Sequence, residues 1–223
     1  MSTPKKPTRR EPKKRVKTAS GRSNSSTRWL ERQLNDPYVQ RAQAEGYRSR
    51  AAFKLKEMDE KLKLIKPGMI ILDLGAAPGG WSQVALERKA AHVIALDLLP
   101  VDSMPGLTFL QMDFMSDEAP ATLLDLTGEG VDMVMSDMAP NTVGHKQTDH
   151  LRIMSLVEAA YDFALQVLKP DGTFLAKVWQ GGAQHELLAQ MKRDFKTVKH
   201  IKPPSSRSDS SESFVIAQGY RPS

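Results

Sequence analysis

Apolar and polar positions alternate in blocks along most of this chain, and the blocks predict strands and helices. Five short apolar runs, each ending in polar or glycine-rich sequence, are predicted strands: Met69–Leu74, His92–Asp97, Leu107–Met112, Val131–Asp137 and Thr173–Trp179. Two more, Lys196–Ile201 and Ser213–Gly219, flank a loop rich in Pro and Ser. Helix-like stretches lie near 80–89, 118–126, 150–169 and 183–195. This order indicates an α/β fold, in which a mostly parallel, seven-stranded sheet is covered by helices on both faces.

The first 26 residues lack this pattern. Residues 1–26 combine three prolines with basic and serine residues and have almost nothing to bury, which predicts a disordered tail. The early prolines disfavour the amphipathic helix of a mitochondrial transit peptide. Residues 27–223 are expected to form a single domain. It should begin with a helix over Thr27–Asn35, and a second helix should start near Ser49.

Composition narrows the class of protein. A chain of 223 residues, 40% of them hydrophobic, suffices for one domain with a substantial core, and no apolar run reaches the length of a membrane span. With no cysteine, disulfides and cysteine-based zinc sites are excluded, which suits a reducing cytosol. We therefore expect a cytoplasmic protein without a membrane anchor.

Charge is divided unevenly along the chain. Residues 1–22 carry nine basic residues against one acidic residue, whereas residues 67–176 carry five basic and fifteen acidic residues. Basic ends around an acidic centre suggest that the flanks hold a polyanion while the centre favours a cation. Ordinary solvated surface charge remains the alternative interpretation.

Lys177 is the most informative single residue. It lies inside the apolar run Phe174–Trp179, where a lysine must shed most of its hydration. Burial and nearby cations both lower the pKa of a lysine, and a lysine with a lowered pKa can act as a general base. Lys177 is therefore a candidate catalytic residue.

Three aspartates stand at the ends of successive predicted strands. Asp97, Asp113 and Asp137 should share one edge of the sheet with Lys177, because ligands of such folds bind beyond the carboxyl ends of the strands. A single strand-end aspartate is more often a helix cap or a turn former. Three of them beside a buried lysine indicate a binding site.

The glycine-rich turn Asp73–Ser82 is compatible in outline with three cofactors. Gly75 to Ser82 has the spacing of a phosphate-binding loop, but Trp81 replaces the lysine that would hold the phosphates of ATP. The turn also lacks the glycine pattern of a dinucleotide site. Neither ATP nor NAD is therefore favoured.

S-adenosylmethionine fits best, because it has no phosphate and its sulfonium suits an acidic centre. Asp97 would hold its ribose diol, Asp113 would receive the adenine amino group, and Gly79 would allow close approach of the backbone. Trp81 would pack beside the ligand, at the start of the following helix, or both.

Several separated motifs then point to one family. They are Ser49–Leu55, Asp73–Gln83, Asp97–Pro100, Ser136–Asn141, Lys177–Gly181 and Ser205–Arg207 together with Glu212. The chain resembles the FtsJ/RrmJ (RlmE) family of bacterial 23S ribosomal RNA uridine 2′-O-methyltransferases from about Ser26 to Gly219. The resemblance implies a Rossmann-like class I S-adenosylmethionine-dependent methyltransferase domain over 27–223.

The resemblance also implies a catalytic tetrad of Lys54, Asp137, Lys177 and Glu212. In this scheme Lys177 accepts the proton of a ribose 2′-hydroxyl, and Lys54 lowers the pKa of Lys177 and touches the RNA backbone. Asp137 orients Lys177 beside the methyl donor, and Glu212 positions Lys177 or the hydroxyl.

The implied substrate is 23S ribosomal RNA, within the assembling large ribosomal subunit. Two alternatives remain open at this level: a transfer RNA ribose 2′-O-methyltransferase, and an RNA-binding ribosome assembly factor whose methylation is dispensable. We expect a monomer that needs no metal, since methyl transfer from a sulfonium needs no Lewis acid. His145 and His150 are expected at the surface or facing RNA.

Overall fold

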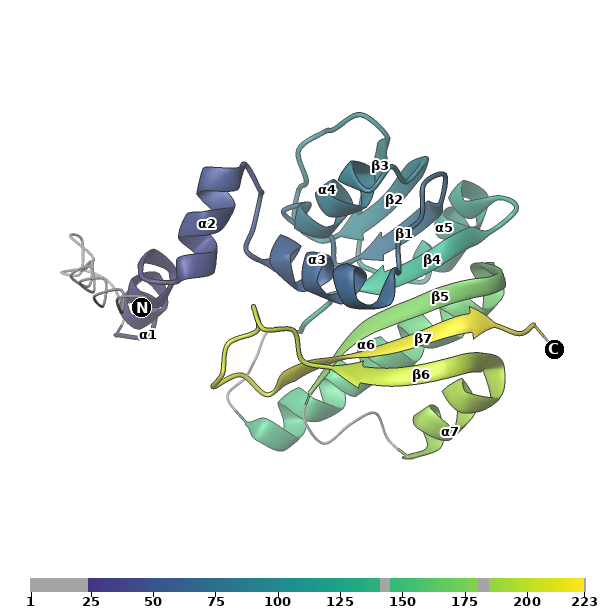
Figure 1. The fold of residues 1–223 in the computed structure, drawn as a ribbon. Coiled ribbons are helices and arrows are strands. Elements are labelled where there is room, and N and C mark those ends of the chain that lie inside the picture. Colours follow the sequence, from purple (N-terminus) through teal and green to yellow (C-terminus); the bar gives the residue numbers. More distant parts are fainter. Residues whose placement is uncertain (1–23, 141–144, 180–184, 223) are drawn as a thin grey trace, which may run out of the picture.

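A seven-stranded sheet forms the centre of the protein (Figure 1). The structure is a computed structural model that describes residues 24–140, 145–179 and 185–222. Its strands are β1 (Ile70–Leu74), β2 (His92–Asp97), β3 (Leu107–Gln111), β4 (Val131–Ser136), β5 (Leu168–Trp179), β6 (Phe195–Ile201) and β7 (Glu212–Tyr220). They are ordered β3-β2-β1-β4-β5-β7-β6, and β7 runs antiparallel to both of its neighbours. The prediction of a mostly parallel, seven-stranded sheet is confirmed.

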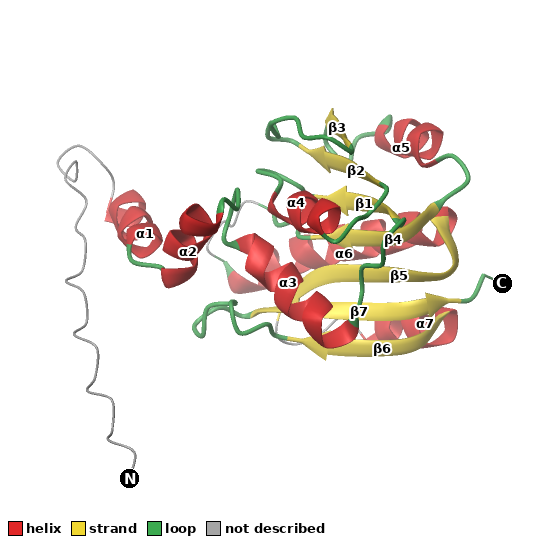
Figure 2. Ribbon diagram, turned by 45° about the horizontal axis from the view of Figure 1, so that its top comes forward, coloured by secondary structure: helices red, strands yellow, loops and turns green. Residues whose placement is uncertain are grey.

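Helices cover both faces of the sheet (Figure 2). One face carries α3 (Ala51–Leu62) and α4 (Gly80–Glu87), and the other carries α5 (Ala119–Thr127), α6 (Lys146–Val167) and α7 (His185–Asp194). Two further helices, α1 (Asn24–Leu34) and α2 (Pro37–Glu45), lie to one side of the sheet, where α1 contacts α2 and α2 contacts α3. None of the helices in the described ranges combines the length and the apolar character needed to span a membrane.

The central strands are apolar on both sides because both of their faces are buried. Along β5, Phe174 and Ala176 belong to the core under α6, whereas Leu175 belongs to the core under α3 and α4. This is the alternation that a strand between two helical layers requires. By the same alternation, Lys177 is directed to the side of the sheet on which α3 lies.

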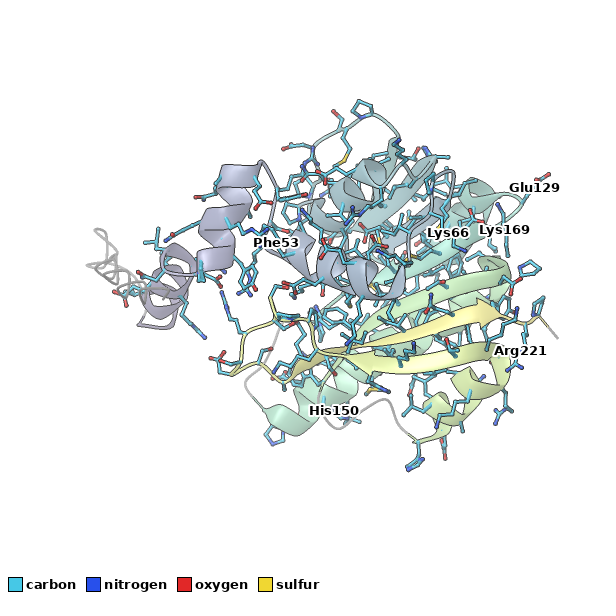
Figure 3. All side chains as sticks on the ribbon, viewed as in Figure 1. Phe53, Lys66, Glu129, His150, Lys169 and Arg221 are labelled. Carbon is cyan, nitrogen blue, oxygen red and sulfur yellow. The ribbon has the colours of Figure 1, made fainter. Side chains whose placement is uncertain are left out.

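Helix α2 was not predicted, although the sequence carries its signals. Asp36 caps it by accepting the Tyr38 N–H at 3.0 Å, Pro37 occupies its first turn, and Gly46 ends it with a left-handed backbone. The helix is fixed to α3 by aromatic contact, since the ring centroids of Tyr38 and Phe53 lie 5.6 Å apart. Figure 3 labels Phe53 among the side chains of the protein. The sequence did not reveal α2 because apolar residues recur only weakly at helical spacing over its nine residues.

Several predicted boundaries shift. Helix α1 begins at Asn24 rather than at Thr27, because small polar residues are tolerated in a first turn without adding to the apolar period. The remainder of the predicted tail, residues 1–23, lies outside the described residues. Helix α6 begins at Lys146, four residues before the predicted position, and is capped by exposed His145, whose Nδ1 faces the Thr148 N–H at 3.4 Å.

Strand β5 begins five residues before the predicted Thr173. Its register with β4 shifts between the pairs Val131↔Leu168 and Met133↔Thr173, so the intervening residues form an irregularity in the strand. Pro170 and Gly172 lie within this segment, which is why the sequence resembled a loop.

A buried carboxyl lies near the carboxyl end of β1. Asp73 has no exposed surface, and the Ser82 hydroxyl donates to its Oδ2 at 2.6 Å. Among the described residues its Oδ1 has no hydrogen-bond partner. Burial raises the pKa of Asp73 from 3.8 to about 7, although the Ser82 hydrogen bond opposes that rise.

Because of Asp73, the free energy of unfolding should decrease as the pH rises. Its folded pKa lies above its unfolded value, so its stabilising contribution is complete below the unfolded pKa and is lost as pH rises through about 7. Between pH 5.5 and 8, we expect the wild type to lose on the order of 2 kcal/mol of unfolding free energy relative to Asp73→Asn. Urea unfolding at both pH values measures this. The exposed Asp125→Asn is the control, and equal pH slopes for all three proteins would contradict the expectation.

Candidate active site

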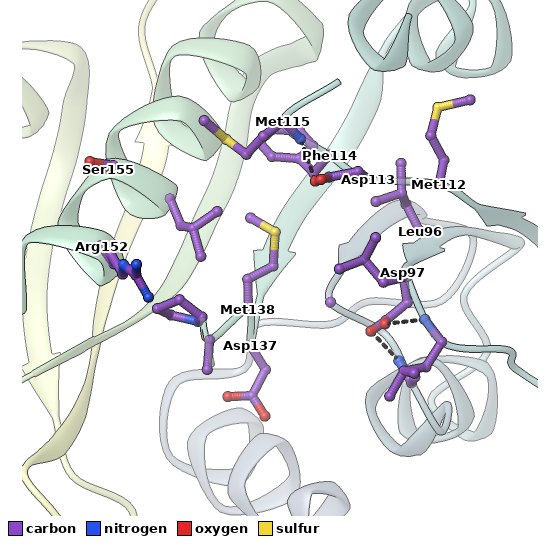
Figure 4. A pocket seen from close by; sticks show the side chains of 17 residues that line it. Leu96, Asp97, Met112, Asp113, Phe114, Met115, Asp137, Met138, Arg152 and Ser155 are labelled. Carbon is purple, nitrogen blue, oxygen red and sulfur yellow. Dashed lines mark hydrogen bonds between the residues drawn. The ribbon is translucent and has the colours of Figure 1, made fainter. Parts of the chain in front are cut away.

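Strand ends meet around a pocket at one edge of the sheet (Figure 4). Asp97 ends β2, Asp113 follows β3 and Asp137 follows β4, and all three line a cavity of about 530 Å³. Much of the rest of its wall is apolar and comes from Leu98, Leu99, Phe114, Met115, Met138 and Leu156. The carboxyl ends of the parallel strands thus bring together the three aspartates predicted from sequence.

Asp97 holds the turn that borders this pocket. Its Oδ2 accepts the N–H of Ala77 and its Oδ1 accepts the N–H of Leu99, both at 2.8 Å (Figure 4). Each carboxylate oxygen retains a second lone pair. Asp97 can therefore shape the turn and still accept hydroxyl groups from a ligand.

Asp113 offers a more open acceptor. Its Oδ1 accepts the N–H of Met115 at 2.9 Å, and the residue is exposed. Within the described parts of the chain, its Oδ2 takes part in no hydrogen bond, so one carboxylate oxygen remains for a ligand that donates an N–H.

Gly75 brings two strand ends together. Its φ is +76°, and a Cβ placed there would lie 2.7 to 2.8 Å from atoms of Met138, including its backbone. Only glycine permits both this left-handed conformation and this close approach. The residue after Asp137 therefore passes directly over the turn that follows β1.

Gly79 and Trp81 lie at the start of α4, and their contact with a cofactor stays a prediction. Neither residue lines the pocket. Gly79 is the N-cap residue of α4, with a φ of +102°, and a Cβ placed there would lie 2.9 Å from Arg48 Nη1. Trp81 is only 3% exposed, its ring centroid lies 5.7 Å from that of Phe214, and its Nε1 donates to the Ala51 carbonyl at 2.9 Å. The indole therefore packs at the helix start, because the first turn of α4 directs it into the core under α3.

The four residues of the implied tetrad form one chain of charges. Lys177 is 8% exposed, and its Nζ donates to the Asp137 carbonyl at 2.5 Å and lies 3.0 Å from Asp137 Oδ1. From α3, Lys54 Nζ lies 3.9 Å from Asp137 Oδ2 and 2.8 Å from Glu212 Oε2. Three strands and one helix, separated by up to 158 residues in sequence, thus meet at this point.

Opposite charges alternate along this chain. Burial alone would raise the pKa of Asp137, but the ammonium groups of Lys177 and Lys54 outweigh it and hold that pKa below its ordinary value. Asp137 therefore stays ionised, and its carboxylate contacts a cation on each side. At the far end, the Ser206 hydroxyl donates to Glu212 Oε1 at 2.8 Å.

Some residues of the site carried no usable signal in the sequence. Arg152 and Ser155 reach the pocket from α6, whose residues reveal only a helix until that helix is placed against β4. The described residues contain no group of three or more His, Cys, Asp or Glu side chains able to hold a metal ion.

Known proteins resemble this chain over nearly its whole length. The family model described as FtsJ-like methyltransferase matches residues 47–220. A ribosomal RNA large subunit methyltransferase E from Xanthobacter autotrophicus is 58% identical, over 99% of this chain and 89% of that protein. A protein of the same name from Rhizorhabdus wittichii is 59% identical, over 94% and 92%. A crystal structure of a ribosomal RNA methyltransferase from Plasmodium falciparum matches with a TM-score of 0.69 at 31% identity, covering 78% of this chain and 98% of that one.

The contact between Gly75 and Met138 can be tested by adding one methyl group. Gly75→Ala should lose about 1 to 2 kcal/mol from its left-handed backbone and more from the overlap with Met138. Gly46→Ala is a matched control, since its φ of +77° is nearly the same but nothing lies within 4 Å of its Cβ position. Urea unfolding should show the larger loss for Gly75→Ala. Equal losses of unfolding free energy in the two variants would mean that the close approach of Gly75 to Met138 does not affect stability.

Proposed function

Since the chain belongs to the FtsJ-like methyltransferase family, we propose that it transfers the methyl group of S-adenosylmethionine to the ribose 2′-hydroxyl of a uridine in 23S ribosomal RNA. The acceptor would be the assembling large ribosomal subunit, in the cytoplasm. One observation carries the proposal: a buried lysine, Lys177, is held by Asp137, and Asp137 also lines the pocket between the strand ends.

The pocket suits the methyl donor. Its volume of about 530 Å³ lies within the range of small-ligand sites. The ribose diol of S-adenosylmethionine requires acceptors, which Asp97 supplies, and its adenine amino group requires an acceptor, which Asp113 supplies. Asp137 places a carboxylate in the same pocket, where a sulfonium would be stabilised.

The reaction needs a proton acceptor and fixed geometry. When bound, the donor supplies a methyl group on a positively charged sulfur. Lys177, in its neutral form, accepts the proton of the 2′-hydroxyl; the oxygen bonds to the methyl carbon, and the electrons of the carbon–sulfur bond remain on sulfur. Removing the proton during attack turns a weak nucleophile into a stronger one.

Asp137 fixes the direction of the Lys177 amine. Its carbonyl accepts a hydrogen bond from Nζ at 2.5 Å, and its carboxylate forms an ion pair with Nζ at 3.0 Å, so two groups of one residue hold the amine. Lys54 has a separate task. When Lys177 is neutral, Lys54 still balances the charge of Asp137, and Glu212 holds Lys54 in place at 2.8 Å.

This charge network also favours catalysis over a purely structural role. Removing four charged groups from water is costly, and apolar residues of similar volume would serve stability at least as well. An assembly factor with dispensable methylation would have no use for such an arrangement. A transfer RNA acceptor would differ only outside the reacting centre, and the name of the relatives, ribosomal RNA large subunit methyltransferase E, favours the ribosomal RNA.

Methyl transfer from labelled S-adenosylmethionine should identify the acceptor. We expect label in isolated large ribosomal subunits or their free 23S RNA, and none in transfer RNA. Nuclease digestion and mass spectrometry should then locate the methyl group on the ribose of a uridine. Label in transfer RNA alone, or on a base, would refute the proposal.

Two substitutions should separate chemistry from binding. Lys177→Met should lower the rate of methyl transfer at least about a hundredfold while donor affinity, measured by calorimetry, stays unchanged. Asp97→Ala should instead weaken donor binding by about 10- to 100-fold, because a charged acceptor is lost. Lys61→Met, an exposed lysine in the last turn of α3, is the control. Undiminished turnover in Lys177→Met would exclude it as the base.

A further inference from the structure

A second, smaller pocket lies on the other side of the charge chain. Its volume is about 180 Å³, and Lys54 and Glu212 form part of its wall. Asp137, at the opposite end of the same contacts, lines the larger pocket. The tetrad therefore lies between two pockets. If the larger pocket holds the methyl donor, the smaller one is placed to receive part of the methyl acceptor.

Two arginines in the wall of the small pocket are held by a single buried carboxylate. Arg50 Nη1 donates to Asp36 Oδ2, and Nε and Nη2 of Arg207 both donate to the same oxygen at 3.1 Å. Asp36 is 8% exposed, and its other oxygen caps α2. One acid thus sets the positions of guanidinium groups that lie 157 residues apart in sequence.

Positive charge exceeds negative charge at this position. Among the described residues that line the pocket, Arg50, Lys54 and Arg207 are basic and Glu212 is acidic, while Asp36 pairs with both arginines. Burial lowers the pKa of the Arg50 guanidinium, Asp36 counteracts that effect, and the nearby charge of Arg207 reinforces it. Two crowded guanidinium groups that share one carboxylate would be stabilised by a second anion.

Specific contacts hold the loop that carries Arg207 against α3. Ser205 is 1% exposed, its N–H donates to Glu57 Oε2 at 2.8 Å, and its carbonyl accepts from Arg50 Nη2. Lys202 Nζ donates to the Ser210 carbonyl at 2.7 Å. Arg207 therefore occupies a defined place, and its side chain keeps 31% of its surface exposed toward an incoming group.

We propose that Arg50 and Arg207, aligned by Asp36, bind the backbone phosphate next to the target ribose. This inference rests on the proposed function. The phosphate of an RNA chain is attached to the ribose carbon adjacent to the one that bears the 2′-hydroxyl. A hydroxyl brought to Lys177 therefore carries a phosphate with it to the neighbourhood of Lys54. Guanidinium groups match the geometry of phosphate oxygens better than ammonium groups do.

In this arrangement Asp36 is a positioning residue that does not touch RNA. Its carboxylate is already engaged by Tyr38, Arg50 and Arg207, and its burial keeps it away from solvent. It couples the start of α2 to the loop before β7. The same contacts would also serve a purely structural purpose, so the test must measure something that structure alone does not change.

Arg207→Met provides that test. With the purified full-length protein and isolated large ribosomal subunits or their RNA, KM for RNA should rise about tenfold. The slope of log affinity against log salt concentration should fall by about 0.7 to 1, as expected for one lost phosphate contact. Affinity for S-adenosylmethionine should not change. Arg207→Lys, which keeps the charge but not the fork, should retain the salt slope and still raise KM.

Arg88→Met is the matched control, because Arg88 also pairs with a buried aspartate, Asp59, at 3.0 Å but lines neither pocket. It should lose stability without altering KM for RNA or the salt slope. If Arg207→Met fails to fold, Arg207→Lys decides: a raised KM supports the phosphate site and a wild-type KM overturns it.

The phosphate site is also overturned if folded Arg207→Met keeps the wild-type KM and salt slope while the wild type methylates RNA. Absence of RNA methylation by the wild type itself would instead count against the proposed function.

Discussion

The burial of Lys177 is the constraint on which the arrangement of charges at the carboxyl ends of the strands depends. A cation in the interior of a sheet is tolerated only when a carboxylate compensates it, and Asp137 supplies that charge at 3.0 Å. Asp137 is half-buried and is balanced on its other side by Lys54, which Glu212 holds. One unfavourable group thus requires a strand end, a helix and an antiparallel strand to meet at one place, and these contacts connect the fold to its chemistry.

The charged residues of the tetrad lie between two pockets that differ in polarity and in charge. The larger one is bordered by apolar side chains and by acids that fit a cationic ligand with hydroxyl and amino groups. The smaller one is bordered by two guanidinium groups and has an excess of positive charge, which fits an anion. A cationic methyl donor and a polyanionic acceptor need opposite surroundings. The tetrad lies between these surroundings, as the proposed reaction at Lys177 requires.

Sequence reasoning succeeded where a residue's environment follows from its neighbours along the chain. The strand ends at Asp97, Asp113 and Asp137 could be predicted because apolar runs mark buried strands and parallel strands share an edge. It was wrong about α2 and about the start of β5, where short polar segments and a strand irregularity hide the pattern. Trp81 shows a different limit, because whether a helix-start indole turns toward a ligand or into the core depends on the element packed above it.

By itself the sequence determined the α/β order, the acidic strand ends and the anomaly of Lys177, since each depends on local periodicity and on the cost of burying charge. The tertiary structure alone decided which charges pair and which glycine must stay a glycine. It also decided that Asp36 holds Arg50 and Arg207 together. Those contacts join residues far apart in the chain. Their distances are set by how helices and strands pack, and packing is a property of the whole fold that no local segment contains.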